Sequence, residues 1–143
     1  MNTVFIDTSA LFKAKKVFRE LIDRNYVLCT SPIVIYEFVK VIDELDPQPE
    51  DIIVEKRMLS GFFGSDLDFT LRNKGTDTLI VTGVATWACV LKTAFDAVEL
   101  GYQVMVPADC CSSPNPQDHE AALTVFKALR VFRPSVEEVI DTL

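Results

Sequence analysis

The chain has 143 residues, of which 49% are apolar and 24% are charged, and its formal net charge is −7 at pH 7. This length and apolar content predict one globular domain with its own core. The acidic balance argues against a nucleic-acid partner, because binding a phosphate backbone usually needs a basic patch. No apolar run reaches the roughly 20 residues of a membrane span. No signal peptide is visible at the start, so we expect a cytoplasmic protein without a membrane partner.

The cysteines are Cys29, Cys89, Cys110 and Cys111, and His119 is the single histidine. Adjacent Cys110 and Cys111 lack the C-x-x-C spacing and the histidine pair of zinc sites, so no metal is expected. All four cysteines are predicted to be reduced thiols, as is usual in the cytosol.

Short apolar segments alternate with helical patterns along the chain. Strands are predicted over residues 3–6, 26–29, 52–54, 78–81 and 103–106, with a short edge strand at 131–132. Helices are predicted over residues 11–24, 31–45, 65–74, 91–100 and 120–129, and from a capping box at Ser135 onward. This alternation predicts an α/β fold, with a doubly wound (Rossmann-like) parallel sheet of five or six strands flanked by helices.

Cys89 follows the apolar strand at 78–81 and a glycine turn, and it precedes the helical pattern from Leu91. In open α/β sheets, ligands bind at this carboxyl edge. The free amides at the start of a helix stabilise a thiolate, which could attack a carbonyl group. An equally consistent interpretation is that Cys89 is a small apolar residue of the core.

Two further residues end predicted strands: Asp7 ends the first, and Lys56 follows the third. If these strands are neighbours, a carboxylate, an ammonium group and a thiol converge at one edge of the sheet. Asp7 would then take the thiol proton and deliver it to a leaving group, while Lys56 would favour the ionised forms. Alternatively, Asp7 caps a helix and Lys56 is a surface lysine.

Residues 42–143 resemble the isochorismatase-like cysteine hydrolases. The resemblance rests on Asp109 and on the segments DIIVEKR (51–57), SGFFGSDL (60–67), TGVATWACV (82–90), TAFDA (93–97) and HEAAL (119–123). It implies a triad of Asp7, Lys56 and Cys89, and a cis peptide between Val84 and Ala85. The oxyanion hole would be formed by the amides of Ala85 and Cys89.

The same resemblance implies hydrolysis of a small nicotinamide, carbamoyl, ureido or isochorismate-like substrate without a cofactor. Phe12, Phe62 and Trp87 are the candidates for contacting that substrate. Packing is favoured for Phe62, whereas Trp87 could equally lie in the core or at an interface. For His119, a capping or packing role is favoured over catalysis. The apolar content of so small a domain also predicts self-association, as a two-fold dimer.

The first third of the chain departs from the family pattern. Where the family carries Asp-x-Gln-x-Asp-Phe, residues 7–12 are DTSALF, and the long loop that normally follows is absent. We therefore expect a single domain over residues 1–143 with a shortened amino-terminal third. Residues 4–11 (VFIDTSAL) and 30–37 (TSPIVIYE) instead resemble the start of a PIN-domain nuclease, in which Asp7 and Glu37 would bind magnesium.

These departures leave alternatives to the hydrolase. The chain could be a natural or engineered hybrid joined near residue 40, or a catalytically silent fold without substrate loops. A metal-dependent nuclease is the least favoured, because the carboxyl half does not resemble that family.

Overall fold

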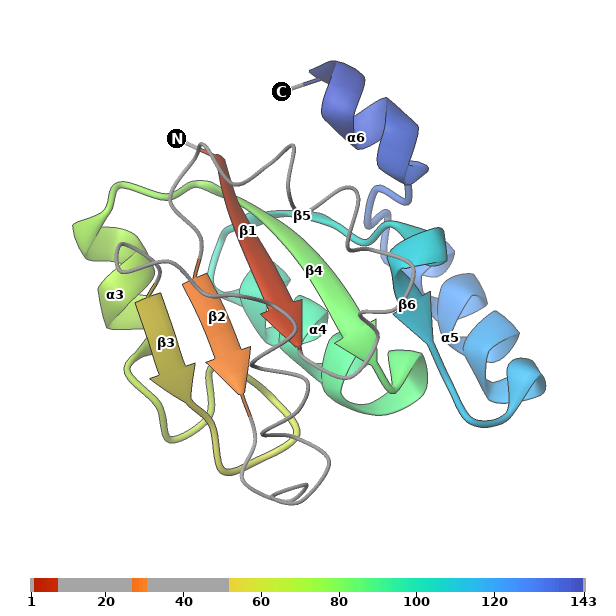
Figure 1. Cartoon of the computed structure of the whole chain (residues 1–143), viewed down its shortest axis with the longest axis horizontal. Coiled ribbons are helices and arrows are strands. Elements are labelled where there is room, and N and C mark those ends of the chain that lie inside the picture. Colours follow the sequence, from red (N-terminus) through yellow and green to blue (C-terminus); the bar gives the residue numbers. More distant parts are fainter. Residues whose placement is uncertain (1, 8–26, 31–51, 143) are drawn as a thin grey trace.

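The computed structural model describes residues 2–7, 27–30 and 52–142 (Figure 1). The elements are, in order, β1 (Asn2–Asp7), β2 (Val27–Thr30), β3 (Ile52–Glu55), α3 (Leu67–Asn73), β4 (Thr78–Val84), the π-helical turn η2 (Thr86–Val90), α4 (Leu91–Glu99), β5 (Gln103–Met105), the 3₁₀ turn η3 (Ala108–Cys110), β6 (Cys111–Ser112), α5 (Pro116–Ala128) and α6 (Val136–Thr142). The helices predicted over residues 11–24 and 31–45 lie outside the described residues.

The strands form a parallel sheet in the order β3-β2-β1-β4-β5, and β6 pairs with the end of β4. Strands β2 and β3 follow β1 on one side of the sheet. The chain then crosses over, and β4 and β5 lie on the other side of β1. Strands β1 and β4 are neighbours and pair in parallel. The third strand, by contrast, is separated from the first by β2. A parallel α/β sheet is confirmed, whereas the doubly wound arrangement stays a prediction because the helices of residues 11–24 and 31–45 are not described.

Strand β4 forms the centre of the core. Every residue from Thr78 to Gly83 is buried, as expected for a parallel strand covered on both faces. The strand continues beyond the predicted residues 78–81 because Gly83 and Val84 pair with Cys111 and Ser112 of β6. Strand β6 has only two residues, too few to produce a periodic pattern in the sequence.

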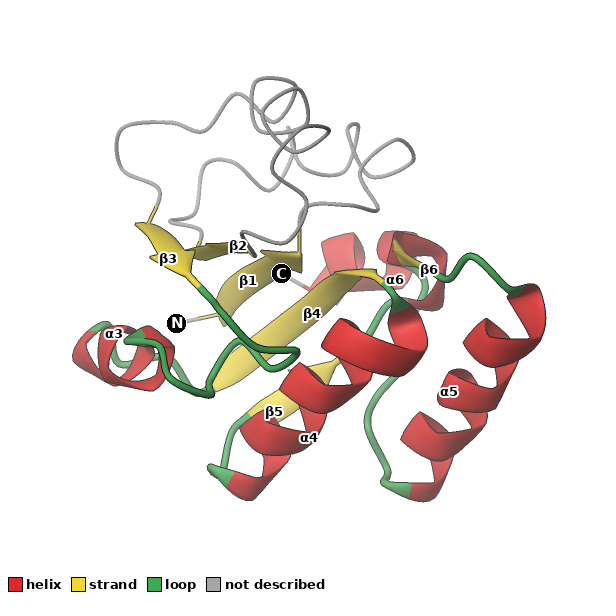
Figure 2. Cartoon of the chain, turned by 90° about the horizontal axis from the view of Figure 1, so that it is seen from below, coloured by secondary structure: helices red, strands yellow, loops and turns green. Residues whose placement is uncertain are grey.

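Helices α3, α4 and α5 pack through narrow apolar stripes. Helix α4 lies along the sheet with α5 beside it (Figure 2), and its buried side chains are the small residues Thr93, Ala94 and Ala97. Small side chains let a helix approach the sheet closely. Helices α3 and α5 instead bury large residues at i,i+4 spacing, Leu67 with Leu71 and Ala122 with Phe126.

Helix α5 begins at Pro116, four residues before the predicted start at residue 120. The side chain of Asn115 accepts a 3.0 Å hydrogen bond from the amide of Gln117, and Pro116 occupies the first helical position. The capping box before α6 is confirmed, because Ser135 and Glu138 exchange backbone-to-side-chain hydrogen bonds of 2.7 and 3.2 Å. The predicted edge strand is reduced to one bridge between Met105 and Phe132.

A polar cluster joins α3 to the start of β5. Asp68 accepts hydrogen bonds from Arg72 Nε (2.9 Å) and from the Tyr102 hydroxyl (2.8 Å). Arg72 also donates to the carbonyl of Leu100 (3.0 Å) and lies over the Tyr102 ring, 5.3 Å from its centroid. Burial, together with the facing Asp68 carboxylate, raises the pKa of Tyr102 to about 12.

Candidate active site

Cys89 lies in the turn that follows the central strand. Strand β4 reaches Gly83 at φ 132°, a conformation that favours glycine, and the peptide bond from Val84 to Ala85 is cis. The carbonyl of Ala85 then accepts hydrogen bonds from the amides of Ala88 (3.0 Å) and Val90 (3.3 Å). Cys89 is a free thiol and half-buried in this turn. It is therefore less enclosed than its buried neighbours Ala88 and Val90, and the choice between a nucleophile and a core residue stays a prediction.

Asp7 is the last residue of β1, and the register of β1 places it at the same edge of the sheet. Ile6 pairs with Thr82 of β4 on one side, and Asp7 pairs with Cys29 of β2 on the other. The backbone of Asp7 therefore leaves the sheet at the level where β4 turns toward Cys89. The geometry of the Asp7 carboxylate is not part of the described structure, so the triad stays a prediction.

Lys56 follows β3 and is fully buried, with 0% of its surface exposed. The interpretation as a surface lysine is therefore wrong. Its ammonium group donates a 3.1 Å hydrogen bond to the carbonyl of Leu59, and the following turn is fixed by a 2.9 Å bond from the Gly61 amide to Thr93 Oγ1 of α4. A buried ammonium group is costly unless it is paired and hydrogen-bonded, so the surrounding chain must supply it with partners.

The aromatic candidates differ in position. The ring of Phe62 stacks on Tyr102, with 5.8 Å between centroids. Tyr102 precedes β5, whose first residue pairs with Thr78 at the start of β4. The ring of Phe62 therefore lies toward the amino edge of the sheet, which supports a packing role for Phe62. Trp87 lies two residues before Cys89 and is 51% exposed. Phe12, like Glu37 of the magnesium hypothesis, lies outside the described residues.

A polar contact between α5 and the cysteine turn was not predictable from the sequence. Thr86 begins η2 and is fully buried. Its Oγ1 lies 2.8 Å from Nδ1 of His119 in the first part of α5. The HEAAL segment marked His119 in the sequence, but nothing there indicated its partner.

The remaining thiols and polar groups offer less chemistry. Burial, and then the nearby Asp109, raise the pKa of the Cys110 thiol to about 12. In the described ranges, no three His, Cys, Asp or Glu residues gather to bind a metal. Ser113, just after β6, is a further missed residue, because its buried hydroxyl has no hydrogen-bond partner within the described structure.

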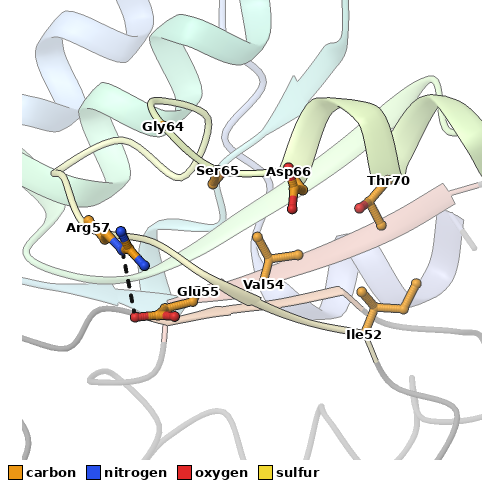
Figure 3. Close-up of a pocket in the computed structure, with 8 residues that line it drawn as sticks. All are labelled: Ile52, Val54, Glu55, Arg57, Gly64, Ser65, Asp66 and Thr70. Carbon is orange, nitrogen blue, oxygen red and sulfur yellow. Dashed lines mark ion pairs between the residues drawn. The ribbon is translucent and has the colours of Figure 1, made fainter.

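An open hollow of about 470 Å³ lies between β3 and the start of α3 (Figure 3). Ile52 and Val54 line it from the strand, and Asp66 and Thr70 face them from the other side. Glu55 and Arg57 form an exposed ion pair of 3.9 Å at its rim. Neither Lys56 nor Cys89 lines this hollow, so we do not assign it to the thiol chemistry.

A parallel α/β sheet with a thiol at its carboxyl edge defines the class of this protein. Residues 37–142 match the model of the isochorismatase domain. The chain therefore belongs to the isochorismatase family, as residues 42–143 indicated. None of the helices in the described ranges is long and apolar enough to span a bilayer.

The chain is 47% identical over 77 residues to the ureidoacrylate amidohydrolase RutB of Stutzerimonas stutzeri, a match that covers 54% of this chain and 31% of the relative. The chain spans less than half the length of the first curated relatives it matches. Among solved structures, it resembles an isochorismatase-like hydrolase from Alkaliphilus metalliredigens (26% identity, TM-score 0.87, 99% and 98% of the two chains covered). It also resembles the nicotinamidase of Staphylococcus aureus (28% identity, TM-score 0.70, 93% and 97% covered).

These similarities correct one expectation. The solved isochorismatase-like hydrolase matches 99% of this chain in three dimensions, which leaves no separate portion for a nuclease fold. A hybrid with a PIN-like start over residues 1–40 is therefore not supported.

Proposed function

We propose that this protein is a cysteine hydrolase that cleaves a small amide or ureide, with Cys89 as nucleophile, Asp7 as proton carrier and Lys56 as the supporting cation. The observation that supports the proposal is the position of these residues after three strands of one parallel sheet, whose carboxyl ends lie at the same edge. Asp7 ends β1, the neighbouring β4 leads into the half-buried thiol of Cys89, and the ammonium group of Lys56 is buried at the end of β3.

The reaction would proceed in two steps. Asp7 accepts the thiol proton, and Cys89 Sγ bonds to the amide carbon while its oxygen becomes an anion facing the amides of Ala85 and Cys89. The C–N bond then breaks, and the proton passes from Asp7 to the leaving nitrogen. Water next attacks the thioester, which releases the acid and restores the thiol. The balance is amide plus water to acid plus amine, with no cofactor.

The substrate class is supported by the relatives. A similar chain is named a ureidoacrylate amidohydrolase, and a similar structure is a nicotinamidase. Both names describe hydrolysis of a C–N bond beside a carbonyl group. Trp87, exposed and two residues from the thiol, is the residue that we propose to contact the planar part of such a substrate.

The test is an assay of the wild-type protein against ureidoacrylate and nicotinamide, followed as loss of substrate and release of ammonia. Cys89→Ala should lower kcat/KM by about 10³-fold or more, since it removes the proposed nucleophile. Cys110→Ala is the matched control and should leave the rate unchanged, because that thiol is buried and its pKa is raised to about 12.

Two results would count against the proposal. Equal hydrolysis by the wild type and Cys89→Ala would remove the thiol from the mechanism. Complete inactivity, together with a Cys89 that does not react with iodoacetamide, would favour the catalytically silent alternative. The lack of the long family loop after residues 7–12 is the observation behind that alternative.

A further inference from the structure

The turn that carries Cys89 is attached to α5 by one polar side-chain contact. Thr86 Oγ1 and His119 Nδ1 are 2.8 Å apart, within normal hydrogen-bond distance. Thr86 is fully buried and His119 half-buried, so water competes little for the hydroxyl. A buried hydroxyl needs a partner, and His119 supplies it.

The contact is anchored at both ends. Thr86 directly follows Ala85, the residue after the cis peptide, and begins the turn that contains Cys89. His119 lies near the capped start of α5, where its amide donates to the Asn115 carbonyl at 3.3 Å. The Asn115 side chain in turn accepts from Gln117. The start of α5 is therefore fixed. If the Thr86 side chain moved relative to it, the peptide groups on both sides of Ala85 would move as well.

We infer that Thr86 and His119 form a positioning pair, in which His119 holds Thr86 and thereby sets the orientation of the Cys89 thiol and the Ala85 amide. The pair does not touch substrate; it acts through the turn. This inference rests on the proposed role of Cys89. A misplacement of reacting groups by about 1 Å costs on the order of 10²-fold in rate, so one lost hydrogen bond at this place has a measurable effect.

The hydrogen bond forms with either tautomer of the imidazole. The Thr86 hydroxyl can donate to a bare Nδ1 or accept from a protonated one. The hydrogen bond to Thr86 therefore requires a polar atom at the Nδ1 position and does not require a charged ring. Asparagine places its terminal oxygen or nitrogen at the same distance from the backbone, whereas phenylalanine keeps the ring and has no polar atom.

The experiment compares His119→Phe, Thr86→Val and their double variant with the rescue variant His119→Asn. The first readout is the rate of Cys89 alkylation by iodoacetamide, measured on its peptide by mass spectrometry. It needs no substrate and so stays informative if the proposed hydrolase activity fails. We expect each single variant to slow this alkylation by about three-fold or more, because the orientation and exposure of the thiol depend on the turn. His119→Asn should restore it, and the double variant should be no slower than either single one.

Where hydrolysis is observed, kcat should fall about 10-fold or more in the two single variants with KM little changed, because the pair orients reacting groups and leaves substrate contacts intact. Cys110 reports loosening of the fold, since it is buried beside β6. Faster alkylation of Cys110 in His119→Phe and Thr86→Val would show a general structural role and overturn the inference. Unchanged Cys89 alkylation in both folded variants, or failure of His119→Asn to restore it, would overturn it as well.

Discussion

Ile6 of β1 and Thr82 of β4 are partners in parallel register, so Asp7 and the turn toward Cys89 leave the sheet at one level. This pairing brings a carboxylate-bearing residue and a thiol-bearing turn to the same edge, although they are far apart in the sequence. Lys56 reaches that edge from β3, with β2 between it and Asp7. The carboxyl edge of a parallel sheet is where such groups meet in α/β proteins.

Replacing Lys56 by methionine tests the buried cation. Met keeps most of the apolar stem and removes the charge, so we expect kcat/KM to fall about 10²-fold or more. The melting temperature should fall as well, because the variant leaves the Leu59 carbonyl without the hydrogen bond from the ammonium group. Steady-state kinetics and thermal unfolding measure the two effects. Lys127→Met, on the exposed side of α5, is the control, and an unchanged kcat/KM in Lys56→Met would contradict a catalytic role.

The thiols of Cys89, Cys110 and Cys111 should differ in reactivity. At pH 8, iodoacetamide should label Cys89 first, because it is half-buried at the start of a helix, whereas Cys110 and Cys111 are buried. Burial and Asp109 raise the pKa of Cys110 to about 12, so its labelling should become appreciable only as the pH rises far above 9. Peptide mass spectrometry gives the order directly. Preferential labelling of Cys110 would identify Cys89 as a core residue.

Tyr102 should make stability depend on alkaline pH. Its pKa is raised from 10.0 to about 12, first by burial and then by the Asp68 carboxylate. The folded state therefore retains the proton more tightly than the unfolded chain. The resulting stabilisation is complete below pH 10 and is lost as the pH rises from 10 through 12.

The variant Tyr102→Phe isolates this effect. At pH 7 it should lower the free energy of unfolding by about 1–2 kcal/mol, because the hydrogen bond to Asp68 is lost. The difference from the wild type should shrink between pH 10 and 12, as the wild type loses its own stabilisation. Urea unfolding at several pH values measures it, and a constant difference across this range would refute the linkage.

Self-association is predicted to use the edge formed by β3 and α3. Phe63 and Phe69 flank the start of α3 and are 64% and 70% exposed, and apolar surface of this kind marks interaction sites. We expect a two-fold dimer in solution that Phe63→Ser and Phe69→Ser weaken. Phe132→Ser, exposed beside β5 at the other edge of the sheet, is the matched control. Light scattering that shows only monomers at high micromolar concentration would refute the prediction.

Much of the described fold could be predicted because its signals are local. The apolar run at 78–81 indicated β4, the small and apolar residues after Leu91 indicated α4, and Ser135 with Glu138 indicated the cap of α6. Each of these signals depends on neighbours within one or two turns of the chain. The family was likewise visible in short segments with a fixed order, chiefly DIIVEKR and TGVATWACV.

Non-local contacts set the features that were missed. Strand β6 exists because Cys111 and Ser112 pair with the end of β4. Two residues are too few to show the alternating pattern of a strand in the sequence. The burial of Lys56 depends on the turn at Leu59 and on Thr93 of α4. The bond from Thr86 to His119 joins two segments whose patterns are independent of each other.

The amino-acid sequence by itself determined the alternation of strands and helices, the position of Cys89 after a buried strand, and membership of the isochorismatase family. These follow from periodicity, helix caps and short motifs, which act over a few residues. Only the tertiary structure decided which strands are neighbours, that Lys56 is buried, and that His119 meets Thr86. Those outcomes depend on packing between segments that are distant in the chain. Such contacts form, and stabilise the protein, only when the sheet brings the segments together.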